Sequence, residues 1–347
     1  AYAETCASIA LIFLCRRLLE AELIGDYADT MERALYNTCL AGMSLDMQRF
    51  FYVNPLSVDP QASRLDDRKR HALPERPKWF GCACCPPNLA RLLSSLALYA
   101  YSATEEAVMV HLYLQGEADL QVGSQEARLS LVTDYPAEGK VLLRVTPGTY
   151  GLRLHLPAWC AKYTLLQNGK PLAHEVKDGY LHIPGPLHAG DIILDMDMPP
   201  YRVYANPAVR EEIGKVALAR GPMVFCLEEV DNGKGLHRLS LPRDAALAWS
   251  RDDSLPGGQK ITKALEDVKT LVVGSGIANY KGTLNKVRGW LNSNIKDDVR
   301  GLRLTADTDA LYAAGPGSTQ TAELTFIPYH AWANRGENEM TVWLREA

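Results

Sequence analysis

The spacing of hydrophobic residues changes once along the chain, from helical to alternating. In residues 3–22 apolar side chains cover most of a helix circumference until the charges that begin at Arg16, which predicts a helix buried on most sides. Residues 26–43 predict a second helix with Asp26 as its N-cap. A third helical repeat follows two prolines, and its apolar positions are Leu89, Leu92, Leu93 and Leu96. Residues 1–104 are therefore expected to form a helical domain.

From Glu105 onward apolar residues alternate with polar ones, which is the pattern of strands with one buried face. The alternation recurs at 108–114, 127–136, 141–148, 150–159, 179–185 and 190–199. Asn168 and Gly169 give the strongest short-range hairpin signal that a sequence offers. Many short strands at regular spacing predict a β-sandwich over residues 105–205.

A second β-rich domain is expected over residues 206–347. Residues 216–230 predict a buried strand pair with a Gly-Pro turn, and residues 323–346 predict two strands joined by a loop through 334–336. The more polar stretch 246–307 has no clear period, so no element is assigned there. The expected fold class is multidomain, with helices first and β domains after them.

A proline-rich segment, residues 58–79, leads to a cluster of cysteines. Its prolines and its run of charged residues predict a surface loop, and long loops in compact domains tend to be functional. The sequence WFGCACCPPN at 79–88 then places Cys82, Cys84 and Cys85 directly before two prolines. This stretch is the main candidate for chemistry in the chain.

These cysteines are expected at the entrance of a helix, because proline is tolerated in a first helical turn. A helix N-terminus carries partial positive charge, so a thiol held there should have a lowered pKa. Packing is the alternative for any single cysteine, since cysteine often behaves as a small hydrophobe. Three clustered thiols are hard to explain by packing, and neighbours such as Cys84 and Cys85 rarely form an unstrained disulfide. The cluster therefore favours metal binding or nucleophilic chemistry.

A zinc ion usually takes four ligands from thiolates, imidazoles and carboxylates. The cysteine cluster offers two or three, and Glu4 with Cys6 is the best source of the remainder, because two such side chains can converge at an irregular helix start. The other interpretation of Glu4 is a solvated charge at a helix start. The histidines show no metal-like spacing. We therefore expect a Zn²⁺ site that is assembled by tertiary folding.

The composition is that of an ordinary soluble globular protein, with 47% hydrophobic and 22% charged residues among 347 and a net charge of −4. No run of lysine or arginine points to nucleic acid, and the longest apolar stretch, 6–15, is too short to cross a membrane. Eight cysteines do not make the dense framework of a small secreted domain, so a reduced, cytoplasmic protein is expected. Because residue 1 already lies in a helical pattern, the chain is expected to begin within a domain.

Five motifs resemble glycoside hydrolase family 127, whose members are β-L-arabinofuranosidase-type enzymes. They are ETCAS at 4–8, FFYVNPLS at 50–57, CACCPPN at 82–88, ARGPMVFCLE at 219–228 and TVWLRE at 341–346. The resemblance covers essentially the whole chain in order. It implies part of an (α/α)6 barrel followed by two β-sandwich domains, which agrees with the order of the predicted elements.

The resemblance also implies a site and a reaction. The implied zinc ligands are Glu4, Cys6, Cys84 and Cys85. Cys84 is implied as the nucleophile of a retaining hydrolase that releases L-arabinose from terminal β-L-arabinofuranosides. Tyr52 is similar to the family's sugar-contacting tyrosine, while Cys82 is given no role. In the family the acid/base glutamate precedes the ETC motif, and this chain has no counterpart of it.

Two other functions stay open. One is a non-catalytic carbohydrate-binding or assembly module with a structural zinc, which would bind sugar without hydrolysing it. The other is cysteine-based acyl transfer, which needs a histidine base, and His71 is the nearest to the thiols in sequence. The expected partner is an arabinofuranoside oligosaccharide, and the β domains offer surfaces for a homodimer.

Overall fold

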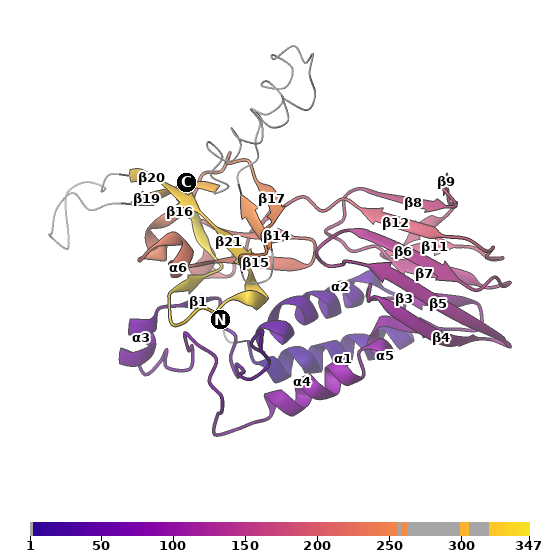
Figure 1. Cartoon of the computed structure of the whole chain (residues 1–347), viewed down its shortest axis with the longest axis horizontal. Helices are drawn as coiled ribbons and strands as arrows, with labels where there is room; N and C mark the ends of the chain where they lie inside the picture. The colour runs from indigo at the N-terminus through magenta and orange to yellow at the C-terminus, as the bar shows by residue number, and fades with distance from the viewer. Residues whose placement is uncertain (1–2, 256–258, 263–298, 305–318) are drawn as a thin grey trace, which may run out of the picture.

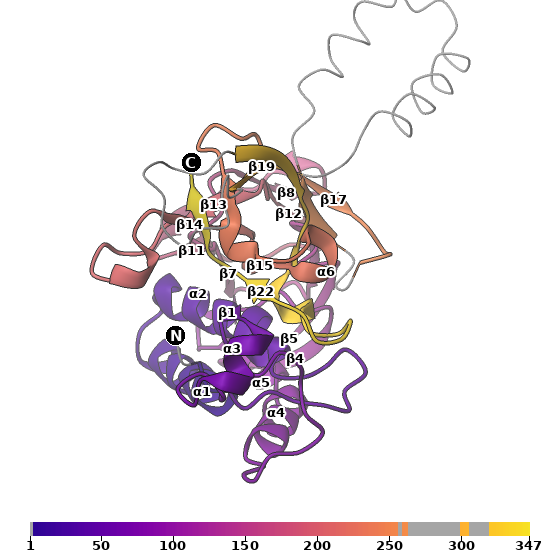
Figure 2. The ribbon, with the colours of Figure 1, turned by 90° about the vertical axis from the view of Figure 1, so that its left-hand side faces the viewer.

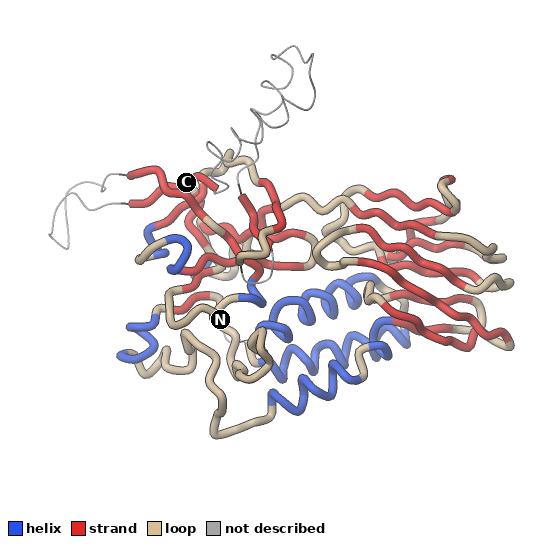
Figure 3. Tube along the Cα trace, in the orientation of Figure 1, coloured by secondary structure: helices blue, strands red, loops and turns tan. Residues whose placement is uncertain are grey.

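The computed structural model describes residues 3–255, 259–262, 299–304 and 319–347. The N-terminal helices lie beneath two groups of β-sheets (Figures 1 and 3). The helical elements of this first part are α1 (Thr5–Ala21), α2 (Gly25–Arg33), the π-helix η1 (Ala34–Cys39), α3 (Pro60–Leu65), α4 (Cys85–Ser94) and α5 (Ala97–Ala100). α1 packs against α2, η1 and α4. No helix in the described ranges is long and apolar enough to cross a membrane.

The middle of the chain forms two sheets. The five-stranded sheet has the order β10 (Glu175–Lys177), β11 (Tyr180–Ile183), β7 (Gly151–His155), β3 (Ala107–Val110), β2 (Tyr101–Ala103). The six-stranded sheet has the order β4 (Gly116–Val122), β5 (Gln125–Thr133), β6 (Lys140–Val145), β12 (Ile192–Met196), β8 (Tyr163–Gln167), β9 (Lys170–Pro171). The buried residues of both sheets and of the helices belong to one hydrophobic cluster, so the core continues from the helices into the sheets.

The last part of the chain builds a twelve-stranded sheet. Its strands from this part are β13 (Tyr201–Val203), β14 (Lys215–Arg220), β15 (Met223–Glu228), β16 (Leu239–Leu241), β17 (Ala248–Arg251), β18 (Gln259–Thr262), β19 (Val299–Leu304), β20 (Thr319–Leu324), β21 (Phe326–Pro328), β22 (Met340–Thr341) and β23 (Leu344–Glu346). The short helices η2 (Arg210–Glu212), α6 (Glu229–Asn232), η3 (Leu236–Arg238) and η4 (Tyr329–Ala331) interrupt them. The twelfth strand, β1 (Ser57–Val58), comes from the N-terminal part and pairs with β22. The first and last parts of the chain are therefore joined by a strand pair.

Two turns predicted from the sequence are confirmed. Asn168 and Gly169 join β8 to β9 with φ of 51° and 77°, the left-handed region that a tight hairpin requires. Gly221, with φ of 54°, turns the chain between β14 and β15. The stretch 246–307, for which the sequence predicts no element, falls largely outside the described residues.

The start of α2 differs from the prediction. The helix begins at Gly25, its N-cap position is Ile24, and Asp26 lies inside the first turn, so the prediction of Asp26 as N-cap was wrong. The Gly25 N–H donates to the carbonyl of Asp178 at 2.7 Å. A Cβ on Gly25 would lie 2.8 Å from the Cα of Gly179, so two backbones touch here. The acceptor at this helix start comes from the β10–β11 turn, which a local pattern does not reveal.

Two expectations about burial are also corrected. α1 is buried along one side only, since Leu11 and Leu14 are 41% and 54% exposed. The segment 58–79 is not wholly a surface loop, because it contains α3 and because Arg76 is only 1% exposed. Charged residues are rarely buried to this degree without dedicated partners.

Polar contacts join α2 to the loops of the middle sheets, which lie beside one end of this helix (Figure 1), while Figure 2 shows the same helices from the side. Glu32 accepts hydrogen bonds from the Tyr135 hydroxyl and, at 3.3 Å, from Trp159 Nε1. Desolvation raises the pKa of the Glu32 carboxyl. Asp29 accepts from the Ala158 N–H at 3.2 Å. The helices are thus fixed to the sheets by specific polar contacts as well as by the shared core.

The buried His111 makes the stability of this core depend on pH. Its Nδ1 lies 2.7 Å from the Tyr180 hydroxyl and its Nε2 lies 2.7 Å from Ser102 Oγ, and burial lowers the pKa of His111 to about 3. The folded protein therefore holds the neutral imidazole, whereas the unfolded chain takes up a proton below its ordinary value of 6.5. We expect the free energy of unfolding to fall by up to about 1.4 kcal/mol per pH unit as the pH drops below about 6.5.

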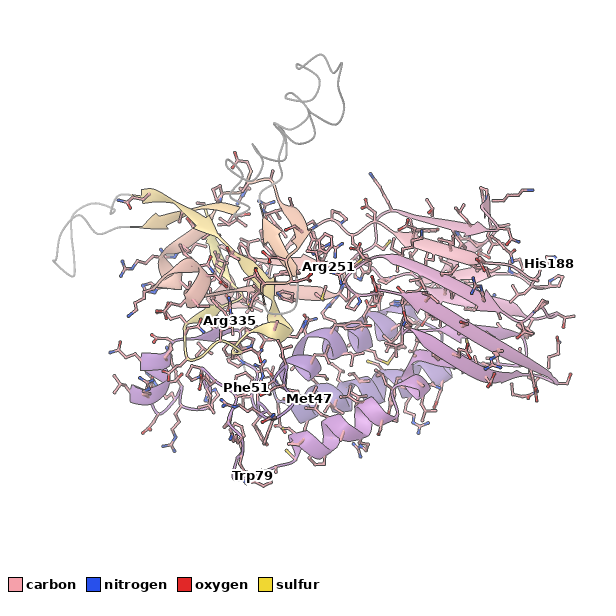
Figure 4. The ribbon with its side chains drawn as sticks, in the orientation of Figure 1. Met47, Phe51, Trp79, His188, Arg251 and Arg335 are labelled. Atoms are coloured by element: carbon pink, nitrogen blue, oxygen red, sulfur yellow. The ribbon has the colours of Figure 1, made fainter. Side chains whose placement is uncertain are left out.

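The measurement is urea unfolding between pH 7.5 and pH 4 for wild type and His111→Gln. The substitution should lower stability at neutral pH and should flatten the acid slope. His188→Gln is the control, because His188 is exposed at the far end of the middle sheets (Figure 4), and it should leave the slope unchanged. An unchanged slope in His111→Gln would contradict the assignment.

Candidate functional site

The first turn of α4 presents two of the predicted cysteines. Cys84 is the N-cap residue, Cys85 is the first helical residue, and Pro86 and Pro87 follow in the first turn. Proline fits there because its missing N–H would have no helical partner. The Asn88 N–H closes the turn on the Cys84 carbonyl at 3.3 Å. The prediction that the cysteines lie at a helix entrance is confirmed for Cys84 and Cys85, whereas Cys82 lies two residues before the N-cap.

The first turn of α1 presents the third cysteine, Cys6, and a hydrogen-bonded segment holds that turn in place. The Thr5 N–H donates to the Tyr52 carbonyl at 3.0 Å, and Thr5 Oγ1 donates to the Phe51 carbonyl at 2.9 Å. Asn54 Nδ2 donates to Thr5 Oγ1 at 2.8 Å. Thr5 and Asn54 are fully buried, so these hydrogen bonds are shielded from water and fix the position of the helix start.

The two helix starts bring three thiols together. Cys6 Sγ lies 3.6 Å from Cys85 Sγ, and Cys84 Sγ lies 3.8 Å from Cys85 Sγ. All three sulfur atoms lie within 4.8 Å of one another. Sulfurs bound to one tetrahedral zinc at the usual bond length would lie about 3.8 Å apart. The spacing of the three thiols therefore fits a single tetrahedral metal ion.

Asn88 completes the surroundings of Cys6. Its Nδ2 donates to Cys6 Sγ at 3.1 Å, from one turn inside α4. A donor to a ligand sulfur stabilises the thiolate form and fixes its direction, which is the usual role of groups just outside a metal's ligands. Asn88 thus adds a second link between α4 and Cys6, beside the direct contact of Cys85 with Cys6.

At Cys85 the thiol pKa differs from the predicted lowering. Burial raises the pKa of the Cys85 thiol well above its usual value, and the neighbouring thiols of Cys6 and Cys84 raise it further. Cys85 is 0% exposed, so loss of water outweighs the helix N-terminus at this position. Three crowded sulfurs can all be thiolates only if a cation offsets their charge. The donor set therefore suits a soft cation such as zinc.

The remaining candidate residues lie around this cluster. Among the described residues the group of close metal-ligand atoms contains the three cysteines and no histidine. That group does not include Glu4, whose backbone pairs with Val53 two residues before Cys6, so its ligation stays a prediction. Tyr52 is half-buried, and its ring centre lies 6.1 Å from that of Phe80. Cys82 is an exposed free thiol outside the group.

Comparison with known families identifies the chain. Residues 1–98 match the catalytic domain of the GH127 β-L-arabinofuranosidases, residues 107–199 match their middle domain, and residues 200–345 match the glycoside hydrolase family 127 C-terminal domain. The chain belongs to glycoside hydrolase family 127.

Individual family 127 proteins agree with this assignment. The chain is 35% identical to a non-reducing end β-L-arabinofuranosidase of Bifidobacterium longum subsp. longum, with 99% of this chain and 49% of the relative covered. A crystal structure of a GH127 β-L-arabinofuranosidase from Geobacillus stearothermophilus T6 matches with a TM-score of 0.86 and 42% identity, over 100% of this chain and 50% of that chain. A second GH127 β-arabinofuranosidase structure matches with a TM-score of 0.78 and 32% identity, again over 100% and 50%. The chain spans about half the length of these relatives.

Sequence reasoning missed the residues that hold the family 127 cysteines in place. Asn88 stands at the end of the quoted CACCPPN motif, one helical turn after Cys84, and that spacing was the available signal. Thr5 and Asn54 also lie within quoted motifs, but nothing in their local sequence shows that they bond to each other across 49 positions.

Metal titration tests the assembled cluster. The chain should bind one Co²⁺ with the absorption of thiolate-to-metal charge transfer, because three thiols converge. Asn88→Ala removes the donor to Cys6 and should weaken Co²⁺ affinity about tenfold. Cys82→Ser is the matched control and should leave the affinity unchanged, since Cys82 lies outside the group. Equal weakening by both substitutions would count against the geometry described here.

Proposed function

We propose that this family 127 chain carries the nucleophile and the metal ligands of a zinc-dependent retaining glycoside hydrolase that releases L-arabinose from terminal β-L-arabinofuranosides. The main support is the meeting of Cys6, Cys84 and Cys85 at two helix starts in a chain whose relatives are named β-L-arabinofuranosidases. The substrate class is carried over from those names to this chain as a proposal.

The proposed zinc ligands are Glu4, Cys6, Cys84 and Cys85. Three thiol ligands with the observed sulfur spacing account for three positions of a tetrahedral site. Glu4 is proposed as the fourth because it precedes Cys6 at the N-cap of α1. When bound, the metal would supply positive charge that keeps the thiols deprotonated at neutral pH.

Cys84 is the better nucleophile of the two α4 cysteines. It is partly exposed at the helix N-cap, whereas Cys85 is 0% exposed and points into the contact with Cys6. In the first step the Cys84 sulfur would form a bond to the anomeric carbon while the bond from that carbon to the leaving oxygen breaks. A carboxylic acid protonates that oxygen. In the second step the resulting carboxylate takes a proton from water, the water oxygen bonds to the anomeric carbon, and the sulfur leaves.

No acid/base residue is assigned within this chain. We propose that it comes from polypeptide corresponding to the half of the relatives that the chain does not match. The exposed apolar side of the helices, with Leu11 and Leu14 on α1 and Leu98 on α5, is where further barrel helices would pack. The helical part is accordingly proposed as part of an (α/α)6 barrel over residues 1–104, followed by β-sandwich domains at 105–205 and 206–347.

Two further proposals concern the compartment of the protein and a residue that contacts the sugar. All eight cysteines are free thiols, which suits a reducing compartment such as the cytoplasm. Tyr52 is proposed to contact the sugar, because its backbone is hydrogen-bonded to the α1 start that carries Cys6. A homodimer stays a prediction.

Substitution of the proposed nucleophile is the decisive test of this function. In the natural polypeptide that contains this chain, Cys84→Ser should lower kcat on a nitrophenyl β-L-arabinofuranoside at least about a thousandfold, because a neutral hydroxyl replaces a thiolate. Mass spectrometry of the wild type under turnover should find an arabinosyl group on the peptide that contains Cys84. Cys82→Ser is the control and should retain wild-type kcat, since that thiol is exposed and outside the cluster.

The outcomes separate the proposal from its alternative. Activity that persists in Cys84→Ser would refute Cys84 as the nucleophile. Sugar binding by the wild type without any hydrolysis would instead support the non-catalytic carbohydrate-binding module.

A further inference from the structure

Arg76 is a deeply buried charged side chain in the segment before the cysteines, and the proposed reaction does not use it. It lies between α3 and α4, in the segment that leads to the cysteines, and it is 1% exposed. Its guanidinium lies 4.7 Å from the ring centre of Phe51 and 6.0 Å from that of Trp332. These two rings stack at 5.1 Å. Burial lowers the pKa of Arg76 to about 10, so it stays charged at neutral pH.

The guanidinium of Arg76 hydrogen-bonds to main-chain carbonyls from two distant parts of the chain. Nε donates to Ala41 at 2.9 Å, Nη1 donates to Trp332 at 2.6 Å and to Ala333 at 3.3 Å, and Nη2 donates to His330 at 3.4 Å. Only the planar fork of arginine presents donors in so many directions, and lysine cannot reproduce it. The side chain therefore ties the cysteine-bearing segment to residues 330–333 of the C-terminal part.

Hydrogen bonds and ion pairs also hold the segment 330–333, whose carbonyls accept from Arg76. The Ala333 N–H donates to Glu228 Oε1 at 3.0 Å, and Glu228 forms an ion pair with Arg335. Arg335 also donates to Asp231 at 2.7 Å. Glu228 is 0% exposed, so this ion pair has little competition from water. The carbonyls that receive Arg76 are thus presented by a fixed loop of the C-terminal sheet.

Two sets of contacts connect Arg76 to the segments that carry the cysteines. The carbonyl of Pro77, next to Arg76, accepts the Phe50 N–H at 3.1 Å, and Phe50 packs on Phe80 with ring centres 5.3 Å apart. Phe80 lies four residues before Cys84. On the other side, Phe51 lies under the guanidinium, and its carbonyl accepts the Thr5 hydroxyl at the start of α1. Figure 4 shows Phe51 between the helices and the C-terminal sheet, and Trp79 at the bend before α4.

We propose that Arg76 is a positioning residue through which the C-terminal domain sets the distance between Cys6 and the α4 cysteines. Arg76 clamps both segments that carry the thiols, one through Pro77 and Phe80 and the other through Phe51. The C-terminal sheet is therefore part of the site's support and not an independent module. This inference deepens the proposed function, but the thiol geometry it concerns can be measured without catalysis.

The test compares Arg76→Met and Arg76→Lys with a matched control, Arg220→Met. Arg220 is also buried, at 4% exposed, lies over the Trp249 ring at 3.7 Å, and donates to the Ala137 carbonyl, but it lies on β14 and supports the middle domain. Both methionine variants should lose stability. Of the two methionine variants, only Arg76→Met should weaken Co²⁺ affinity, by about 10- to 100-fold. Arg76→Lys should weaken it by a smaller factor.

A second readout uses no metal. In a Cys82→Ser background, a bifunctional alkylator that fluoresces only after bridging two neighbouring thiols should react several-fold more slowly with Arg76→Met than with Arg220→Met, because the thiols move apart. Equal bridging rates and equal Co²⁺ affinities in the folded variants would overturn the proposal. If Arg76→Met does not fold, Arg76→Lys, which keeps the charge and most of the volume, decides by the same readouts. If the alkylator bridges the thiols of the wild type but the wild type binds no metal, the proposed zinc site is refuted. The bridging rates of the Arg76 and Arg220 variants then still test the positioning role of Arg76.

Discussion

The site depends on the contact between the N-terminal turns of α1 and α4. Cys6 and Cys85 are 79 positions apart, yet their sulfurs lie 3.6 Å from each other. Neither turn could hold a metal ion alone, because α4 offers two thiols and α1 offers one. The contact is maintained by Asn88, which donates to Cys6 from α4, and by the buried Thr5 and Asn54, which fix the start of α1. Local unfolding of either turn would separate the thiols.

The two β domains contact the helical part of the chain at different places. The middle sheets contact α2 through Glu32 and through the close approach of Gly25 to Gly179. The C-terminal sheet contacts the segment before the cysteines more directly, because the Arg76 guanidinium lies over the stacked rings of Phe51 and Trp332. Burying an arginine costs desolvation free energy even when main-chain carbonyls accept its hydrogen bonds. The planar guanidinium, however, fixes the directions of those hydrogen bonds. Under our proposal, this contact is how the C-terminal β domain supports a site that is built on two helices.

The sequence predicted the fold well where the signal was local. The alternation after Glu105, the Asn168–Gly169 hairpin and the proline-started helix after Cys85 follow from spacing and from residue conformational preference. The family motifs identified which distant segments belong together. Arg76 could not be found this way, because prolines and charges around it are typical of a surface loop. The raised pKa of Cys85 could not be predicted from the sequence either. Burial by another segment raises this pKa by more than the helix N-terminus lowers it.

X-ray absorption at the zinc edge, on the zinc-loaded protein, tests most directly whether one metal ion joins the two helix starts. The account predicts about three sulfur neighbours at about 2.3 Å and one lighter oxygen or nitrogen neighbour. A first shell of oxygen and nitrogen only, or with a single sulfur, would contradict it, because the thiols of residues 6, 84 and 85 would then not share one ion.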